Sequence, residues 1–350
     1  MSSCYCKVSG YSPITRRKFS LLDQNRFDIE NMFCTSLAMR CNLIAALIWV
    51  ARLCFIFAWS AIALSATDIL ILQSHNSTPY QLTLAGFQSS MASSSLEVAY
   101  QRLDIPSSSD TNVLIQLLQN YNPKLILTLG TPATRASLSQ VKQIPMVAGL
   151  VLDIEELGQN VNATGVGLNF PASVQWLWLH RILPEARQIA VLYDPRQGSA
   201  LFQTLQKQAL ADGINLIPAP AASAVDLPAL IKNLPTQLDA LWAVDGAAAY
   251  NPAAVRELLL YSFRNRVPLI GLSAQWVKAG ALYALDWDYS DLGAQSADLA
   301  KDILLKGISP ASLTPLTPRK VRPVFNTKTA EHMKLYISDR LLSEMSEVIQ

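Results

Sequence analysis

The chain has 350 residues, of which 51% are hydrophobic and 15% are charged, and its formal net charge is +2. A disordered protein and a protein that coats nucleic acid both need denser charge, so the composition excludes these two classes and predicts no nucleic-acid partner. A single hydrophobic core stops growing at roughly 250 to 300 residues, so this length allows one large domain or two lobes.

The N-terminal residues predict export. We assign no fold to residues 1–38, which represent an unassigned leader or a misplaced start. From Met39 a short basic region leads into an apolar run over residues 53–66, typical of a signal peptide (39–66) cut after Ser65 or Ala66. The alternative joins residues 43–66 into one membrane anchor that stays uncut. Arg52 argues against a span, because an arginine in mid-membrane costs about 2.5 to 3.5 kcal/mol.

Either fate of the leader places the folded part outside the cytoplasm, and we expect a periplasmic protein that is membrane-anchored only if the leader remains uncut. All five cysteines lie within the first 54 residues. The exported part therefore has no thiol that would mispair in an oxidising compartment.

Beyond residue 66, short apolar runs alternate with amphipathic stretches, which is the pattern of an α/β fold with parallel sheets covered by helices on both faces. The predicted strands are residues 69–72, 125–129, 146–150, 189–193, 240–244, 269–272 and 281–285. The predicted helices are residues 82–91, 113–120, 174–183, 201–211, 252–265 and 292–306, and a terminal helix from Thr327. These units predict two doubly wound, Rossmann-like lobes.

A hinge with three crossings is expected to join the lobes. Lobe 1 is predicted from residues 67–172 plus 286–314, and lobe 2 from residues 173–285 plus 315–350, with a proline-rich crossover at residues 315–325. Such a hinge leaves a cleft, and clefts are the default location of small-molecule ligands.

Five sequence blocks, in order along the exported part, carry a resemblance to a known family. They are KLILTLGTPATRA (124–136), NATGVGLNFPAS (162–173), PEARQIAVLYDPRQGSA (184–200), the block at 268–307 and NTKTAEHMKL (326–335). Together they resemble the ABC transporter substrate-binding proteins of the tryptophan/tyrosine-uptake type.

The resemblance implies a type I periplasmic-binding-protein fold without catalysis. Its two lobes would close on a small ligand, often an aromatic amino acid, and deliver it to an inner-membrane ABC permease and its ATPase. The chain departs from the family at Gly246, because an asparagine commonly follows the aspartate of that loop. We expect a monomer with no cofactor.

The loops beyond the carboxyl ends of the strands supply the candidate ligand-binding residues. In the loop after residues 125–129, Gly130 allows a tight turn, and Thr131 and Thr134 supply hydroxyl groups. The N-terminus of the next helix lies there too, so this loop suits an acidic group of the ligand. Asp245 follows another strand and suits a ligand ammonium. Each position has a structural alternative as an ordinary helix cap.

The remaining candidates stand after the first strand, after the strand at 269–272 and at the hinge. They are His75, Tyr80, Ser273, Trp276 and Asp286. Ser273 offers a hydroxyl and Trp276 an aromatic surface, although a tryptophan is also a common core residue. Asp286 and its neighbour Asp288 either hold the closed form or cap the following helix.

Two further function classes are weighed against solute uptake. A ligand-sensing or orphan binding protein would signal to a membrane partner without transport, and its lobes would obey the same physics of differential affinity. An enzyme is disfavoured, because GLSAQ (271–275) lacks the closing glycine of a nucleophile elbow and no HExxH or GxxxxGKS/T motif occurs. The three scattered histidines also predict no metal site.

Overall fold

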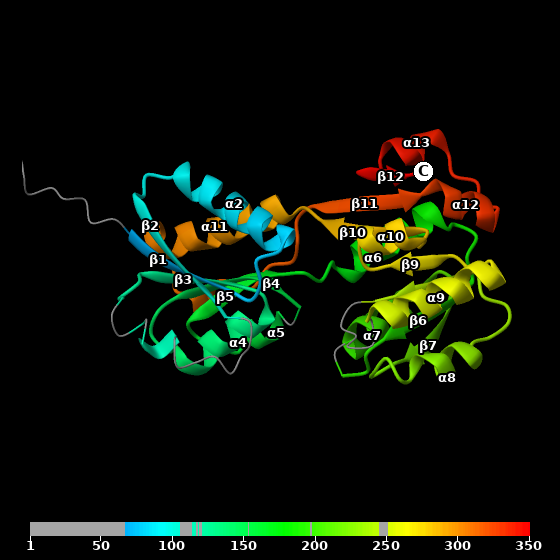
Figure 1. Ribbon diagram of the computed structural model, residues 1–350, viewed down its shortest axis with the longest axis horizontal. Helices are drawn as coiled ribbons and strands as arrows, with labels where there is room; N and C mark the ends of the chain where they lie inside the picture. The colour runs from blue at the N-terminus through cyan, green and yellow to red at the C-terminus, as the bar shows by residue number, and fades with distance from the viewer. Residues whose placement is uncertain are drawn as a thin grey trace, which may run out of the picture. The chain divides into compact units, whose positions relative to one another are not determined.

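The computed structural model describes residues 67–105, 114–116, 118, 121–152, 154–196, 198–244 and 251–350 (Figure 1). The predictions for residues 1–66, for most of the helix at 113–120 and for Asp245 lie outside these residues. Ala66–Gln350 forms one compact unit. No helix in the described ranges is long and apolar enough to cross a membrane.

Five parallel strands form the first sheet, in the order β2, β1, β3, β4, β5. Their bounds are β1 (Thr67–Gln73), β2 (Val98–Asp104), β3 (Leu125–Leu129), β4 (Met146–Val151) and β5 (Ala163–Gly167). Strands β1, β3 and β4 confirm the predictions. The sequence did not predict β2, an edge strand with polar side chains, or β5, which consists mostly of small residues.

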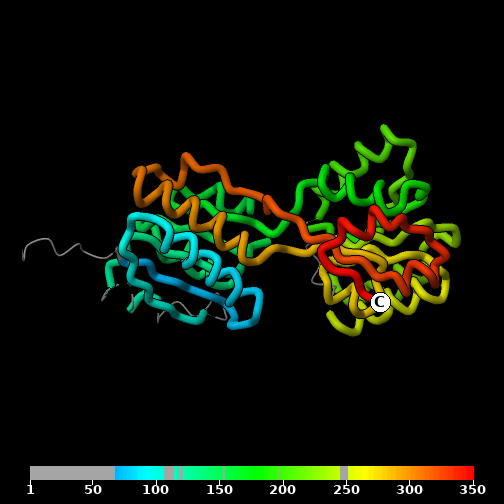
Figure 2. Tube along the Cα trace, turned by 90° about the horizontal axis from the view of Figure 1, so that it is seen from above, coloured from blue at the N-terminus to red at the C-terminus, as the bar shows by residue number. Residues whose placement is uncertain are grey.

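Helices α2 (Thr78–Ala92) and α11 (Tyr289–Lys306) lie side by side on one face of this sheet, although they are far apart in sequence (Figures 1 and 2). Two glycines permit their close contact. A Cβ atom at Gly86 would meet the carbonyl oxygen of Ser290, and one at Gly293 would meet that of Thr83. The other face is covered by α4 (Thr131–Gln140) and α5 (Glu155–Gly158).

The alternation of side chains along β1 divides the core of this lobe into two layers. Ile69 and Ile71 pack on the side of α2 and α11, and Leu70 and Leu72 pack on the side of α4. All four side chains are at most 1% exposed. The central residues of the strand, 69–72, are therefore apolar on both faces, as expected for a parallel sheet that is covered on both sides.

Seven strands form the second sheet, in the order β12, β11, β10, β9, β8, β6, β7, and only β10 and β11 pair antiparallel among the described strands. Their bounds are β6 (Gln188–Tyr193), β7 (Asn215–Pro220), β8 (Ala240–Ala243), β9 (Leu269–Gly271), β10 (Tyr283–Trp287), β11 (Val321–Asn326) and β12 (Glu347–Ile349). The helices of this lobe are α6 (Ala172–Ile182), α7 (Ser199–Ala211), α8 (Leu227–Lys232), α9 (Pro252–Asn265), α10 (Ala274–Ala279), α12 (Thr327–Met333) and α13 (Asp339–Ser343).

The expected crossover at 315–325 needs one correction. Strand β11 occupies Val321–Asn326 and pairs with β10, because Val324 and Phe325 are apolar, at most 1% exposed, and complete the core of the second lobe. The crossing itself is therefore shorter than predicted. It follows the single-turn helix η1 (Pro310–Ser312) and ends where β11 begins.

The chain passes between the two sheets three times. The first crossing joins β5 to α6, the second joins β10 to α11, and the third leads from η1 to β11. The third crossing runs beside β5, since the Leu316 N–H donates to the Gly165 carbonyl at 2.8 Å and the Gly167 N–H donates to the Leu316 carbonyl at 2.9 Å. These hydrogen bonds attach the third crossing to the edge strand β5 of the first sheet, just before the first crossing begins.

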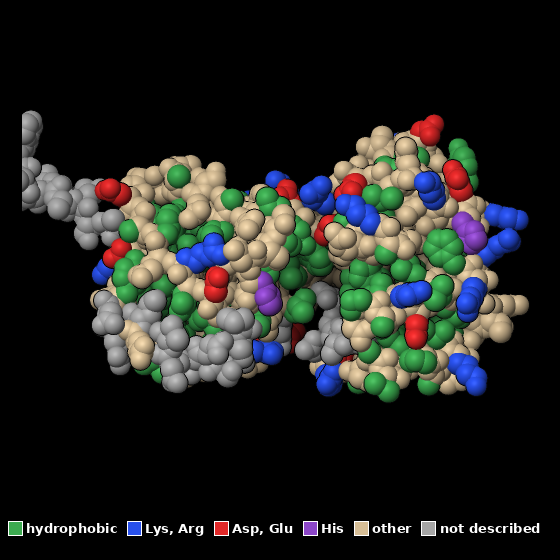
Figure 3. Space-filling view, in the orientation of Figure 1, with side chains coloured by type: hydrophobic (Ala, Val, Ile, Leu, Met, Phe, Trp, Pro, Cys, Tyr) green, Lys and Arg blue, Asp and Glu red, His purple; other side chains and the backbone are tan. Residues whose placement is uncertain are grey.

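An ion-pair network fastens the third crossing to α11. Arg319 contacts both carboxylate oxygens of Asp291, with its Nε at 3.1 and 2.9 Å, and its Nη1 lies 3.1 Å from Asp298 Oδ2. Burial raises the pKa of Asp291, but hydrogen bonds and charge from Arg319 and Lys320 outweigh it and hold the pKa below its usual range. On the face shown in Figure 3, basic and acidic side chains are interspersed.

Candidate functional site

The loop after β3 forms a compact group with the end of β1. Gly130 adopts a φ of +90°, in the left-handed region that favours glycine, and precedes α4. A side chain at this position would collide with the Tyr80 hydroxyl and with Ser74 Oγ. The Ser74 hydroxyl accepts a hydrogen bond from the Ala133 N–H at 3.0 Å. Ser74 was not predicted, although it directly follows β1.

The structure brings His75 and Tyr80 to this same group. Their rings meet edge to face with centroids 5.7 Å apart, and the His75 side chain is exposed. Burial raises the pKa of Tyr80, and its hydrogen bond with Ser74 opposes that change. Thr131, next to Gly130, is half-buried. Four of the predicted residues thus share one edge of the first sheet.

Thr134 lies deeper than the rest of its loop. Its side chain is 4% exposed, and its hydroxyl lies 2.9 Å from the Thr128 hydroxyl while donating to the Gly130 carbonyl at 2.9 Å. The Thr134 hydroxyl is therefore already hydrogen-bonded to groups inside the first lobe. Of the two predicted threonines, Thr131 is the more exposed, because its side chain is half-buried whereas that of Thr134 is buried.

On the second sheet, Ser273 precedes α10 with extended backbone and makes no side-chain cap to that helix. Trp276 is half-buried, packs against Gly271 and joins the core beneath α9 and α10, so packing accounts for much of its surface. Asp286 accepts a hydrogen bond from the Trp287 N–H at 3.0 Å and another from the Ala274 N–H. Asp286 therefore ties the end of β10 to the start of α10.

The hinge aspartates have different roles. Burial raises the pKa of Asp286, against the opposing hydrogen bonds from Trp287 and Ala274. Asp288 caps α11, because its Oδ1 accepts a hydrogen bond from the Asp291 N–H at 3.0 Å. The capping alternative is thus correct for Asp288. Asp245 lies outside the described residues, and the structure does not place it.

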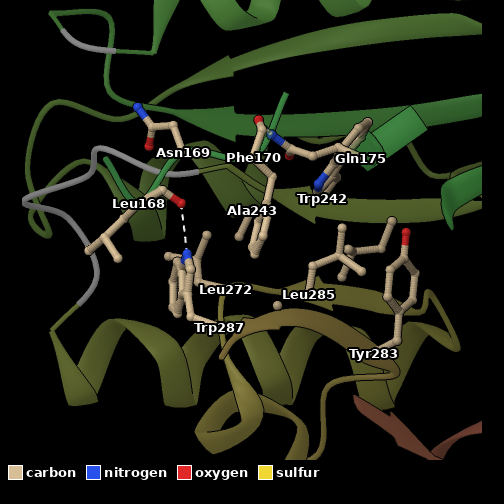
Figure 4. A pocket seen from close by; sticks show the side chains of 12 residues that line it. Leu168, Asn169, Phe170, Gln175, Trp242, Ala243, Leu272, Tyr283, Leu285 and Trp287 are labelled. Carbon is tan, nitrogen blue, oxygen red and sulfur yellow. Dashed lines mark hydrogen bonds between the residues drawn. The ribbon is translucent and has the colours of Figure 1, made fainter. Parts of the chain in front are cut away.

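A pocket lies where the first two crossings meet the second sheet (Figure 4). Its lining residues are Leu168, Asn169, Phe170, Gln175, Trp242, Ala243, Ile270, Gly271, Leu272, Tyr283, Leu285 and Trp287. Of the predicted site residues that the structure describes, none lines this pocket. Ser273 and Asp286 are direct sequence neighbours of lining residues.

Aromatic rings and backbone bonds fix the shape of this pocket. Phe170 and Trp287 stack with centroids 5.8 Å apart and planes 13° apart, and Trp287 Nε1 donates to the Leu168 carbonyl at 2.7 Å (Figure 4). The Gln175 amide donates to the Phe170 carbonyl at 2.9 Å. Tyr283 is 1% exposed, and burial raises the pKa of its phenol far above the usual range, so the hydroxyl stays protonated.

One polar atom at the pocket has no partner. Asn169 Nδ2 donates to the Leu152 carbonyl at 2.9 Å, but Asn169 Oδ1 is buried and accepts no hydrogen bond from the residues that the structure describes. The described residues contain no group of three His, Cys, Asp or Glu side chains able to hold a metal ion. The site thus offers aromatic walls and a free hydrogen-bond acceptor, which suits binding of a small organic molecule.

Residues 68–349 match the sequence model of the family described as ABC transporter substrate binding protein. The chain belongs to this family. The membership confirms the resemblance that the five sequence blocks carry. A substrate-binding family agrees with the expected function class of solute capture.

A curated relative of this substrate-binding protein is the tyrosine-binding protein of Clostridioides difficile (strain R20291). The two are 23% identical over 223 residues, which make up 60% of this chain and 63% of the relative. The match therefore spans less than two thirds of the relative's length.

Two solved structures share the fold. One is the ABC domain in complex with L-Trp from Streptococcus pneumonia, with 20% identity and a TM-score of 0.62. The other is a ligand-free, open substrate binding protein with adhesive properties from Clostridium difficile, with 18% identity and a TM-score of 0.67. Both comparisons cover 81% of this chain and 100% of the other. They confirm the predicted two-lobed α/β fold.

Proposed function

We propose that the protein is an exported solute-binding protein that captures a small solute, an amino acid or a related compound, for an ABC importer. The observation that carries the proposal is the aromatic pocket at the crossings of a chain that belongs to this family. The C. difficile relative is named for tyrosine, and the S. pneumonia structure holds L-Trp. Both names favour an aromatic amino acid.

Capture would work through the hinge. The pocket takes its residues from the first two crossings and from the ends of β8, β9 and β10. A rotation of the lobes changes the backbone of the crossings, so a solute that contacts them stabilises one arrangement by its differential affinity. The free solute-binding protein is a periplasmic monomer in this proposal, and the closed form docks on an inner-membrane permease with its ATPase.

The sheet edges supply the polar ends of the site. Gly130 and Thr131, at the start of α4, would meet an acidic group, beside His75 and Tyr80. Ser273 and Asp245 from the second lobe, together with Asp286 at the end of β10, would meet a basic group of the solute, and Trp276 would support that edge. The proposed lobe boundaries remain 67–172 plus 286–314 and 173–285 plus 315–350.

A thermal-shift screen of the purified full chain against amino acids, short peptides, nucleosides and sugars tests this function. At 100 times its dissociation constant a solute adds about 2.7 kcal/mol to the free energy of unfolding, so a bound solute raises the Tm clearly. We expect L-tyrosine or L-tryptophan to do so. Phe170→Ala should abolish the shift, and Phe263→Ala, which removes a phenylalanine outside the pocket lining, should preserve it.

A screen in which no solute raises the Tm would contradict solute capture. Transport is tested separately, by measuring uptake of the same solute in cells that lack the protein. Unchanged uptake would favour a sensing protein without a transport role.

A further inference from the structure

Asn169 stands on the first crossing with one half of its amide bonded and the other half free. The Nδ2 donates to the Leu152 carbonyl at 2.9 Å, and within the described part of the chain the buried Oδ1 has no partner. The Leu152 bond settles which atom is the oxygen, because a flipped amide would place two oxygens face to face. In Figure 4 the oxygen is on the side nearer to the other labelled residues, and the nitrogen is on the side away from them.

A buried acceptor without a partner is unusual in a native protein. Burying a polar atom away from water costs free energy, and a hydrogen bond offsets that cost. A buried polar atom without a hydrogen bond therefore points to a missing water, ion or ligand. The acceptor lies on a crossing, where hinge motion concentrates its backbone changes. A donor that arrives with the solute would therefore satisfy it in the bound state.

The other residues that line the pocket indicate which kind of solute could donate a hydrogen bond to Asn169 Oδ1. Phe170 and Trp287 present stacked rings, and Leu272 and Leu285 add apolar surface. The ring N–H of Trp287 already donates a hydrogen bond to the Leu168 carbonyl, so it does not donate to Asn169. The pocket thus combines apolar and aromatic walls with one acceptor, Asn169 Oδ1, that lacks a donor among the described residues. This combination is complementary to a flat ring that carries its own N–H or O–H group.

We propose that Asn169 is a specificity-determining residue of the solute site, whose Oδ1 accepts a hydrogen bond from an N–H or O–H group on the ring of an aromatic solute. This inference rests on the proposed function and deepens it. It selects between solutes of the same size, because a ring without a donor would leave the buried oxygen unsatisfied.

Calorimetric titration of the purified full chain with two matched pairs of probes tests the inference. The pairs are L-tyrosine with L-phenylalanine and L-tryptophan with 1-methyl-L-tryptophan, which differ in the ring donor. We expect the donor-bearing member of at least one pair to bind about tenfold more tightly, in line with the net value of one hydrogen bond. The Asn169→Leu variant, similar in shape but without an acceptor, should bind both members of that pair within about twofold.

The readout is a ratio of two affinities in one preparation, so partial loss of folded protein leaves it unchanged. Asn265→Leu is the matched control, because Asn265 also donates its amide to a backbone carbonyl, that of Tyr261, at 2.8 Å, but on an exposed surface. This control should keep the wild-type ratio.

Three results would overturn the inference. Equal binding of both members of each pair by the wild type, or an unchanged ratio in Asn169→Leu, would remove the role of Asn169 while solute capture stands. Binding of none of the four probes would also overturn it. In that case the wider thermal-shift screen decides whether the proposed function fails as well.

Discussion

Asp286 ends β10 with a carboxyl group that is partly withdrawn from water. Burial raises its pKa above the usual range, and the hydrogen bonds from Trp287 and Ala274 together with the charge of Arg322 oppose the change. A raised folded-state pKa means that ionisation is less favourable in the folded protein than in the unfolded chain. The stability contributed by the protonated form is complete below about pH 3.9 and is lost as the pH rises through the folded pKa.

We therefore expect Asp286→Asn to have a higher free energy of unfolding than the wild type at pH 7. The amide removes the cost of a buried charge and keeps one oxygen as an acceptor for the Trp287 N–H. The difference should shrink as the pH falls toward 3, and urea unfolding at several pH values measures it. Asp339→Asn, on an exposed side chain of α13, is the control. A difference that grows on acidification would contradict the account.

The residues of the candidate site were only partly predictable. Gly130, His75 and Tyr80 follow apolar strands in the sequence, and parallel strands end at the same sheet edge, so their proximity followed from topology. Asn169 and Trp287 were missed as pocket residues, because they are far apart in the chain and meet only where two crossings touch. The block GVGLNFPA, placed at the lobe boundary, was the available signal for Asn169.

At the scale of elements, the pairing of α2 with α11 explains how a helix from late in the chain completes the first lobe. A Cβ at Gly293 would meet the Thr83 carbonyl oxygen and the Phe87 backbone nitrogen. Both are helix backbone atoms, which cannot move aside as a flexible side chain would. The contact is therefore intolerant of any side chain at this position.

We predict that Gly293→Ala lowers the free energy of unfolding by about 1 to 3 kcal/mol, the usual cost of overpacking. Urea denaturation followed by circular dichroism measures this change. Gly158→Ala is the matched control, because a Cβ there would meet nothing within 4 Å, and it should be neutral or slightly stabilising. Equal stability of Gly293→Ala and the wild type would show that the helices do not pack this closely.

The elements that the sequence missed share a physical reason. The strand predictions relied on continuous apolar runs, which mark strands buried on both faces. Edge strand β7 carries Pro218 and Pro220, which an edge tolerates, and β5 is rich in glycine, so both resembled loops. The helix Pro252–Asn265 was predicted with its correct bounds, because Asn251 and Pro252 give a clear start signal.

At the scale of the whole molecule, three crossings join the two sheets, and the first two of them also contribute to the pocket. The first crossing supplies Phe170 and Asn169, and the second begins at Trp287. The third is held to α11 by Arg319 and Asp291. A solute in this pocket would contact the segments that must change when the lobes rotate. Binding and hinge closure are therefore one event in this account.

Small-angle X-ray scattering of the purified full chain tests this claim most directly. The measurement compares the radius of gyration without solute and with a saturating concentration of the aromatic amino acid that raises the Tm. We predict a smaller radius of gyration in the presence of the solute, because closure brings the lobes together. A solute that binds and leaves the radius unchanged would contradict capture by hinge closure.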